Sequence, residues 1–263
     1  MEYPKHVVKI GERDENVVKA VKRALNEALA LNEGDDLYLD PDNPRFGPNM
    51  KNVVKLFQLR NVDADGTPLK QDGEIGSLTW AALFGSNAVP VTAAADDAFV
   101  SRVLEIAANE AAKQVREDPK NSNRGPEVNA YLASTGTGPG HAWCCAFVYW
   151  CFDKAASETG RPNPMVKTAG CLDHWNKARK KGVRVIPKQE AVADPGLVRP
   201  GMVFIADHGR GAGHTGLVEQ VTGGLITTIE GNTDASKTRE GGGVYRLRRK
   251  IADINKGFIQ YAP

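Results

Sequence analysis

The apolar positions in the first third of the chain recur three and four residues apart, which is the period of a helix with one buried face. This spacing predicts three helices, at residues 17–31, 53–59 and 77–85. Asp14 or Asn16 is placed to cap the first helix, and a polar stretch rich in Asp, Pro and Gly, residues 32–48, separates it from the second. Together these features predict a small three-helix bundle.

Beyond residue 97 the pattern is first helical and then strand-like. Apolar spacing predicts further helices at residues 99–116 and 144–156. From Gly201 onward, short β-branched runs separated by glycines predict antiparallel strands at residues 202–205, 215–221, 225–229, 244–247 and 258–261. Helices followed by a sheet indicate an α+β domain.

The stretch between these two patterns, residues 86–96, consists mostly of small residues with one proline. Such a composition is typical of a linker between domains. We therefore predict two domains joined by this linker, at residues 1–85 and 97–263.

The composition is that of a globular protein of 263 residues, with 41% hydrophobic and 25% charged residues. The formal net charge of +2 is too small to indicate nucleic acid binding. No apolar run is long enough to span a membrane, and residues 1–30 lack the features of a signal peptide. We therefore expect synthesis in the cytoplasm, no membrane insertion, and a monomer.

One stretch of the second domain places a thiol at the start of a helix. Cys144 opens the helix predicted at residues 144–156. Unpaired amides at a helix N-terminus stabilise a thiolate over a thiol, which favours a nucleophile at this position. The Cys145 side chain lies about 100° further round the helix. We expect it to pack in the core, as we do for Cys151 and Cys171.

Residues suited to assist a thiolate follow Cys144 along the chain. Acyl transfer by a thiolate needs a base and a group that fixes the tautomer of that base. His214 stands at the edge of one strand-like run, and Glu230 and Asn232 stand at the end of another. We expect the basic run at residues 246–250 to form the solvated face of a strand. The remaining histidines are expected in turns: His6, His141, His174 and His208.

The cysteines are expected to be free thiols. Cys144 and Cys151 lie about 10 Å apart along their helix, which exceeds the roughly 7 Å that a disulfide spans between Cα atoms. A zinc site formed by His208, His214 and a cysteine is the metal alternative, but no Cys-x-x-Cys pair supports it. We expect neither a metal nor a cofactor.

Three motifs together resemble the CHAP family, the cysteine, histidine-dependent amidohydrolases/peptidases that cut bacterial peptidoglycan. They are Trp-Cys-Cys-Ala-Phe-Val (143–148), Gly-His-Thr-Gly-Leu-Val (213–218) and Ile-Glu-Gly-Asn (229–232). The resemblance covers residues 97–263 and implies a papain-like α+β fold, shared with the NlpC-like peptidases. It implies that Cys144 is the nucleophile and His214 the base, and that Glu230 and Asn232 orient the histidine.

The same resemblance extends to the segment before the cysteine helix. Residues 122–131 are similar to the groove-forming lead-in of the family. On this resemblance we expect Asn123 and Glu127, together with Trp143, to bind substrate.

Residues 57–83 resemble the second half of the helical peptidoglycan-binding domain that is often fused to cell-wall hydrolases. The resemblance is carried by Phe57-Gln58 and by Asp72-Gly73-x-Ile75-Gly76-x-x-Thr79-Trp80-x-x-Leu83. The first half departs from the family, which has a short Asp-Gly-x-Phe-Gly turn where this chain has a long acidic insertion. We expect a peptidoglycan-binding-like domain here.

Together the resemblances imply a peptidoglycan hydrolase that its N-terminal bundle holds on the wall while the papain-like domain cleaves an amide bond. The reaction stays open between an N-acetylmuramoyl-L-alanine amidase and an endopeptidase, including an NlpC-like endopeptidase within the stem peptide. A non-catalytic wall-binding protein with a degenerate hydrolase domain is the non-enzymatic alternative.

The lack of a signal peptide leaves two expected routes to the cell wall or periplasm. One is the release of a phage endolysin through a holin. The other is the secretion of an antibacterial effector, which implies secretion machinery and an immunity protein.

Overall fold

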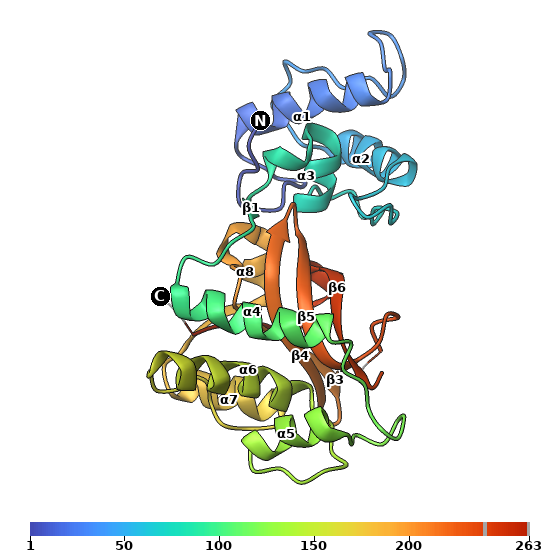
Figure 1. Cartoon of the computed structure of the whole chain (residues 1–263). Helices are drawn as coiled ribbons and strands as arrows, with labels where there is room; N and C mark the ends of the chain where they lie inside the picture. Colours follow the sequence, from blue (N-terminus) through green and yellow to red (C-terminus); the bar gives the residue numbers. More distant parts are fainter. Residues whose placement is uncertain (239–240, 262–263) are drawn as a thin grey trace. The chain divides into compact units, whose positions relative to one another are not determined.

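The computed structural model describes residues 1–238 and 241–261 and divides the chain into two compact units (Figure 1). The first unit holds residues 1–91 together with 192–196 and 222–224, and the remaining described residues form the second. Among the described residues no helix has the length and the apolar character needed to cross a bilayer.

The first unit is described throughout residues 1–91 and is built on the helices that apolar spacing predicted. They are α1 (Glu15–Ala28), α2 (Pro48–Arg60) and α3 (Ser77–Phe84). Asp14 caps α1, because its side chain accepts hydrogen bonds from the backbone N–H groups of Asn16 and Val17. The helices enclose an apolar core that includes Val21, Leu25, Val53, Phe57 and Trp80.

The long polar connection between α1 and α2 is held by buried polar side chains of α1. Asn26 exchanges two hydrogen bonds with the backbone of Leu39, at 2.8 and 3.1 Å. The Lys22 ammonium donates to the carbonyls of Asp40 and Asn43. These bonds satisfy backbone groups that the irregular connection leaves without a helix or sheet partner.

The buried side chain of Gln58 holds the Asp72-Gly73 part of the peptidoglycan-binding-like motif in place. Its side-chain NH₂ donates to the Asp72 carboxylate and to the Glu74 carbonyl, at 3.1 and 2.8 Å. Its carbonyl oxygen accepts from the backbone N–H of Gly73 at 2.9 Å. One buried amide thus fixes the loop between α2 and α3.

From residue 86 onward the chain alternates short elements with longer helices before it enters the sheet. The helices are η1 (Ser86–Ala88), α4 (Ala98–Ala112), α5 (Pro126–Ser134), α6 (Cys144–Thr159), α7 (Cys171–Lys180), α8 (Lys188–Ala193), η2 (Pro195–Leu197) and η3 (Ile251–Asp253). The strands are β1 (Val91–Thr92), β2 (Arg184–Pro187), β3 (Val203–Gly209), β4 (Ala212–Thr222), β5 (Leu225–Thr233), β6 (Gly243–Lys250) and β7 (Gly257–Gln260). Sequence patterning did not predict α5, α7, α8 or β2.

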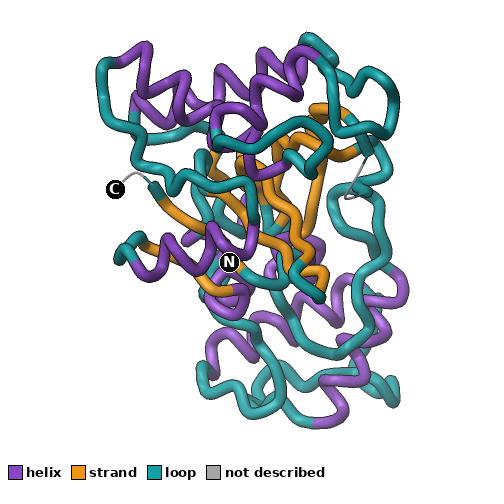
Figure 2. The backbone as a smooth tube through the Cα atoms, turned by 90° about the horizontal axis from the view of Figure 1, so that it is seen from below, coloured by secondary structure: helices purple, strands orange, loops and turns teal. Residues whose placement is uncertain are grey.

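The strands form one sheet in the order β2-β7-β3-β4-β5-β6, and β1 pairs with β4. The pairs β2·β7, β7·β3, β3·β4 and β5·β6 run antiparallel. Helices α4, α6 and α7 pack against this sheet (Figure 2) and share one apolar core with it. This arrangement confirms the predicted α+β class and fits a papain-like fold, which sets the start of α6 beside strands β4 and β5.

Candidate active site

Cys144 is the first residue of α6, as the sequence predicted, and its side chain is 3% exposed. The residue before it, Trp143, occupies the N-cap position without making a side-chain capping bond. Trp143 therefore caps none of the N–H groups of the first helical turn, and the partial positive charge of such groups favours a thiolate at the start of the helix.

The buried imidazole of His214, on β4, is bonded to the buried carboxylate of Glu230, on β5. The His214 Nε2 and Glu230 Oε2 atoms are 2.7 Å apart. Burial opposes protonation of this ring, but its interactions with Cys144 and Glu230 outweigh it and raise the pKa of His214 to about 9. Because Nε2 is bonded to Glu230, Nδ1 is the ring nitrogen available to the Cys144 thiol.

Glu230 is itself held by Arg249, on β6. The guanidinium binds the carboxylate at two points, with Nε to Oε1 at 2.6 Å and Nη2 to Oε2 at 2.7 Å. The Thr228 hydroxyl also donates to Glu230. Burial would raise the pKa of Glu230, but the bonds with Arg249 and His214 lower it to about 2. Glu230 is therefore ionised in the folded protein at neutral pH.

Arg249 corrects the prediction that residues 246–250 are a solvated face. Its side chain is only 15% exposed. Side chains alternate along a strand, so Arg249 points to the same side of β6 as Leu247, which is buried. The alternation of Leu247 and Arg249 in the sequence already indicated a shared side of the strand, but the run of basic residues suggested that all of it is solvated.

Two glycines in the sequence motifs allow the elements of the site to pack closely together. A side chain on Gly216 would begin 2.6 Å from the Cγ atom of Glu230. One on Gly231 would begin 2.7 Å from the indole of Trp143 and 2.8 Å from Phe147. Glycine at both positions therefore lets β4 approach Glu230 and lets α6 pack closely on β5.

Asn232 does not take part in orienting the histidine in this structure. The residue is fully buried, with φ at 57°, and neither polar atom of its side chain has a hydrogen-bond partner among the described residues. The bond to the ring comes from Glu230. The expectation that Glu230 and Asn232 share this task is therefore corrected to Glu230, itself held by Arg249.

The residues expected to bind substrate have different surroundings. Glu127 is exposed in the first turn of α5, whereas Asn123 is half-buried and donates its backbone N–H to Glu117 at 3.0 Å. Trp143 is fully buried and its indole N–H also donates to Glu117, at 2.9 Å. A buried indole presents no surface to a substrate, so Trp143 supports the site from within. Glu117, which the sequence analysis missed, ties the Asn123 loop to Trp143.

A second thiol and imidazole pair lies beside the first. Cys145 Sγ is 3.8 Å from His174 Nδ1 and donates to the Thr168 carbonyl at 3.3 Å, while His174 Nε2 is 2.5 Å from the Tyr261 hydroxyl. Burial lowers the pKa of His174 to about 4. His174 is thus a buried neutral side chain within α7, and the prediction that it lies in a turn is wrong.

All four cysteines are free thiols, as the sequence predicted, and all four are buried, which was expected for Cys145, Cys151 and Cys171. Cys144 Sγ is 3.4 Å from Cys171 Sγ. The hydrogen bond with Cys171 and burial raise the pKa of Cys144, and the interaction with His214 opposes them. Among the described residues no group of three or more His, Cys, Asp and Glu side chains is arranged to hold a metal ion.

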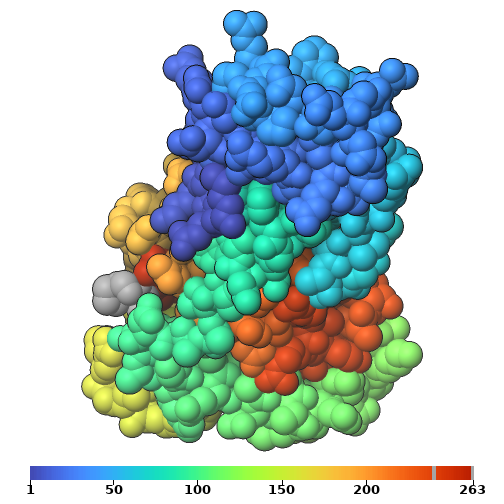
Figure 3. Space-filling model, turned by 90° about the horizontal axis from the view of Figure 1, so that it is seen from above, coloured from blue at the N-terminus to red at the C-terminus, as the bar shows by residue number. Residues whose placement is uncertain are grey.

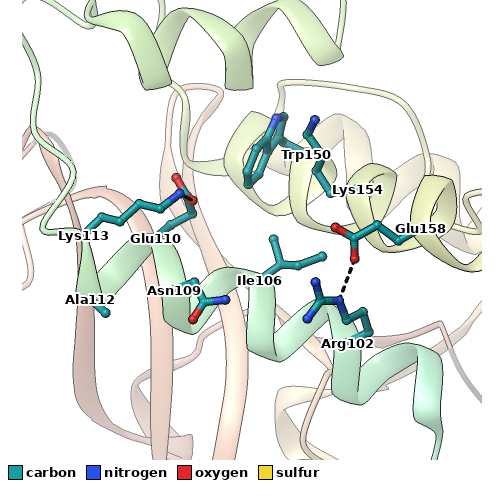
Figure 4. A pocket seen from close by; sticks show the side chains of 9 residues that line it. All are labelled: Arg102, Ile106, Asn109, Glu110, Ala112, Lys113, Trp150, Lys154 and Glu158. Atoms are coloured by element: carbon teal, nitrogen blue, oxygen red, sulfur yellow. Dashed lines mark hydrogen bonds and ion pairs between the residues drawn. The ribbon is translucent and has the colours of Figure 1, made fainter.

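A separate cavity of about 620 Å³ lies between α4 and α6 (Figure 4). Arg102 and Glu158 form an ion pair at 2.6 Å on its wall, and Trp150 carries Lys154 over its ring. The buried carboxylate of Glu110 is bonded to Tyr131 and Lys113. None of the predicted site residues lines this cavity.

Comparison with known families agrees with the geometry. Residues 136–232 match the family model described as CHAP domain, and this segment includes Cys144, His214, Glu230 and Asn232. This segment of the chain is similar to CHAP domains. The chain is accordingly an enzyme, a cysteine- and histidine-dependent amidohydrolase or peptidase that acts on peptidoglycan. No curated protein and no solved structure matches the chain.

Proposed function

We propose that the CHAP domain cleaves an amide bond of the peptidoglycan peptide with Cys144 as nucleophile and His214 as base. Proton transfer from the Cys144 thiol to His214 gives a thiolate beside an imidazolium, and the thiolate sulfur attacks the amide carbonyl carbon. The ring returns this proton to the leaving amine when the C–N bond breaks, which leaves a thioester. Water, activated by the same ring, then hydrolyses the thioester and frees Cys144.

The observation that supports this proposal is the buried chain of contacts from Cys144 through His214 and Glu230 to Arg249. The bidentate Arg249 contact fixes Glu230, and the 2.7 Å bond fixes the imidazole plane and leaves Nδ1 for the thiol. An imidazolium with a pKa of about 9 favours a thiolate beside it and opposes the hydrogen bond with Cys171 and the burial that raise the pKa of Cys144. The backbone N–H of Cys144, in the open first turn of α6, is our proposed oxyanion donor.

Cys145 is the rival nucleophile, and its surroundings do not activate it. Its thiol donates to a carbonyl, which requires the protonated form. Its histidine partner, His174, is neutral at physiological pH and bonds to the Tyr261 hydroxyl in place of a carboxylate. A neutral ring that carries no negative partner provides little electrostatic stabilisation of a thiolate.

Digestion of purified peptidoglycan, followed by mass spectrometry of the soluble fragments, tests the proposed reaction. An N-acetylmuramoyl-L-alanine amidase would release peptides with a free N-terminal L-Ala and leave glycan strands without peptides. An endopeptidase would leave the lactyl amide intact and open the stem or bridge peptide. If the wild-type protein releases no fragments beyond those of a heat-inactivated sample, the protein only binds the wall and the proposal fails.

We also propose that the first unit holds the enzyme on its insoluble substrate. Residues 1–91 (blue to green in Figure 3) present a continuous surface on the face shown. The Gln58 contacts support this proposal, because they build the loop of the peptidoglycan-binding-like motif. Tethering of this kind raises the local concentration of substrate.

A full-length Cys144→Ala variant is expected to sediment with insoluble peptidoglycan as the wild-type protein does. The substitution lies outside residues 1–91, so binding through the first unit persists while cleavage is lost. Chitin of equal mass is the control polymer, since it lacks the peptide. Loss of sedimentation in a variant that still unfolds cooperatively would place wall binding in the catalytic domain instead.

The route to the wall belongs to the same proposal. We propose that the enzyme acts in the periplasm or at the wall, either as an endolysin after release or as an antibacterial effector after secretion. A holin encoded beside the protein would favour the first role, and an immunity protein the second.

A further inference from the structure

The first turns of two helices bring a second thiol against the proposed nucleophile. Cys144 opens α6 and Cys171 opens α7, and their sulfur atoms are 3.4 Å apart. A disulfide has a bond length of about 2.05 Å, so the two sulfurs need to approach by only about 1.4 Å. Rotation of the two side chains at fixed helix ends supplies a movement of this size.

We propose that Cys144 and Cys171 form a reversible oxidative modification site, at which a peroxide converts the two thiols into a disulfide. The sulfur of the Cys144 thiolate attacks one peroxide oxygen, which gives a sulfenic acid and releases hydroxide. The Cys171 sulfur then attacks the sulfenic sulfur, the S–S bond forms, and water leaves. In sum two thiols lose two electrons and two protons, and hydrogen peroxide is reduced to two waters.

The arrangement favours Cys171 over the other thiols as the partner of Cys144. Cys145 is adjacent in the same helix with its side chain turned about 100° away, and Cys151 lies about 10 Å further along the axis. Cys145 is also engaged with Thr168 and His174. Cys171 interacts with Cys145 as well, so a Cys145–Cys171 bond is the competing product.

The disulfide has two consequences for an enzyme that leaves a reducing cytoplasm. Cys144 in a disulfide cannot attack a carbonyl, so the hydrolase is inactive until a thiol reductant reduces the disulfide. A sulfenic acid that is captured by Cys171 also escapes further oxidation to the sulfinic acid, which thiols do not reverse. These consequences rest on the proposed role of Cys144, whereas the modification itself rests on the contact between the two sulfurs.

Peptide mapping of the full-length protein tests the modification. The reduced protein is treated with hydrogen peroxide, remaining thiols are blocked with N-ethylmaleimide, and tryptic peptides are analysed by mass spectrometry. We expect the peptide of residues 125–154 linked to that of residues 168–177, about two mass units below their sum. The link should persist in Cys145→Ala and disappear in Cys144→Ala and Cys171→Ser.

A link that survives in Cys144→Ala would show that Cys145 is the partner of Cys171, and the proposal would be wrong. So would a wild-type protein in which Cys144 reaches the sulfinic acid with no link formed.

Activity gives the second readout, each variant being compared with its own untreated sample. Peroxide should inactivate the wild-type enzyme and dithiothreitol should restore it. Cys171→Ser should lose its activity without recovery, because the sulfenic acid on Cys144 is not captured by a second thiol and excess peroxide oxidises it to the sulfinic acid, which dithiothreitol does not reduce. If the linked protein stays active, the proposed disulfide is still supported, but Cys144 is not the nucleophile. Failure of the modification can therefore be distinguished from failure of the proposed function.

Discussion

Replacement of Cys144 by alanine is expected to lower kcat/KM for peptidoglycan cleavage by roughly 10⁴-fold or more. Alanine removes the sulfur that forms the thioester, and the contact of Cys144 with His214 has no substitute on Cys145. The fold should survive, because alanine removes only one sulfur atom from the core. Release of soluble muropeptides per unit time is the measurement, and unfolding in urea verifies the fold of the variant.

Cys145→Ala is the matched control for this experiment. It removes a thiol of the same size and burial from the next position of α6. The Cys145 contacts with Thr168 and His174 lie away from Glu230, so we expect a change of less than about tenfold, which a modest packing loss explains. An inactive Cys145→Ala beside an active Cys144→Ala would assign the chemistry to the His174 pair instead.

The position of Cys144 was accessible from the sequence because helix starts are local features. The apolar period of residues 144–156 and the strand pattern around His214 place each residue at the edge of its element, and the structure confirms both edges. Three motifs far apart in the chain each carried part of the site. Glycines in two of these motifs indicate where the backbone lies close to a neighbour. Gly216 lies against Glu230, and Gly231 lies against α6.

The contacts that tune the site could not be predicted from local pattern. Arg249 meets Glu230 across 19 positions, Cys171 meets Cys144 across 27, and Glu117 meets Trp143 across 26. Each of these pairs joins segments far apart in the sequence, and α7, which supplies Cys171 and His174, was not predicted as a helix. A cysteine or arginine alone gives no sign of its partner, so only the register of the sheet and the packing of α6 on α7 reveal these contacts.

Glu230→Gln is expected to lower kcat/KM by roughly 10³-fold, close to the loss for His214→Ala. Glutamine keeps the shape of the side chain but removes the charge that stabilises the imidazolium. The structure shows no bond from Asn232 to the ring, so Asn232→Ala should cost much less than Glu230→Gln. Equal losses in the two variants would restore the shared role for Asn232.

The same substitution should change the pH dependence of stability. The folded pKa of His214, about 9, lies above its ordinary 6.5, so its contribution is complete below pH 6.5 and is lost as the pH rises through 9. The folded pKa of Glu230, about 2, lies below its ordinary 4.5, so its contribution is complete above pH 4.5 and is lost as the pH falls through 2. The pair therefore stabilises the native protein most between pH 4.5 and 6.5.

In Glu230→Gln the charged partner of His214 is gone, and only the interaction with Cys144 still opposes the effect of burial, so the pKa of the ring falls. The loss of unfolding free energy between pH 6.5 and 9 should therefore be smaller than in the wild-type protein. Arg249, whose side chain is only 15% exposed, also loses its carboxylate partner, which should reduce stability by about 3 kcal/mol. Urea unfolding at intervals from pH 5 to 9 measures both effects.

Glu219→Gln is the matched control, since Glu219 on β4 forms the same kind of bidentate pair with Arg246 on β6, but at the surface. Exposed pairs contribute about 0 to 1 kcal/mol, so this variant should keep the activity and the pH profile of the wild-type enzyme. If both variants behaved alike, charge at the surface of the sheet would explain the effect. A large difference would instead show that the energy resides in the buried contact from Arg249 through Glu230 to His214.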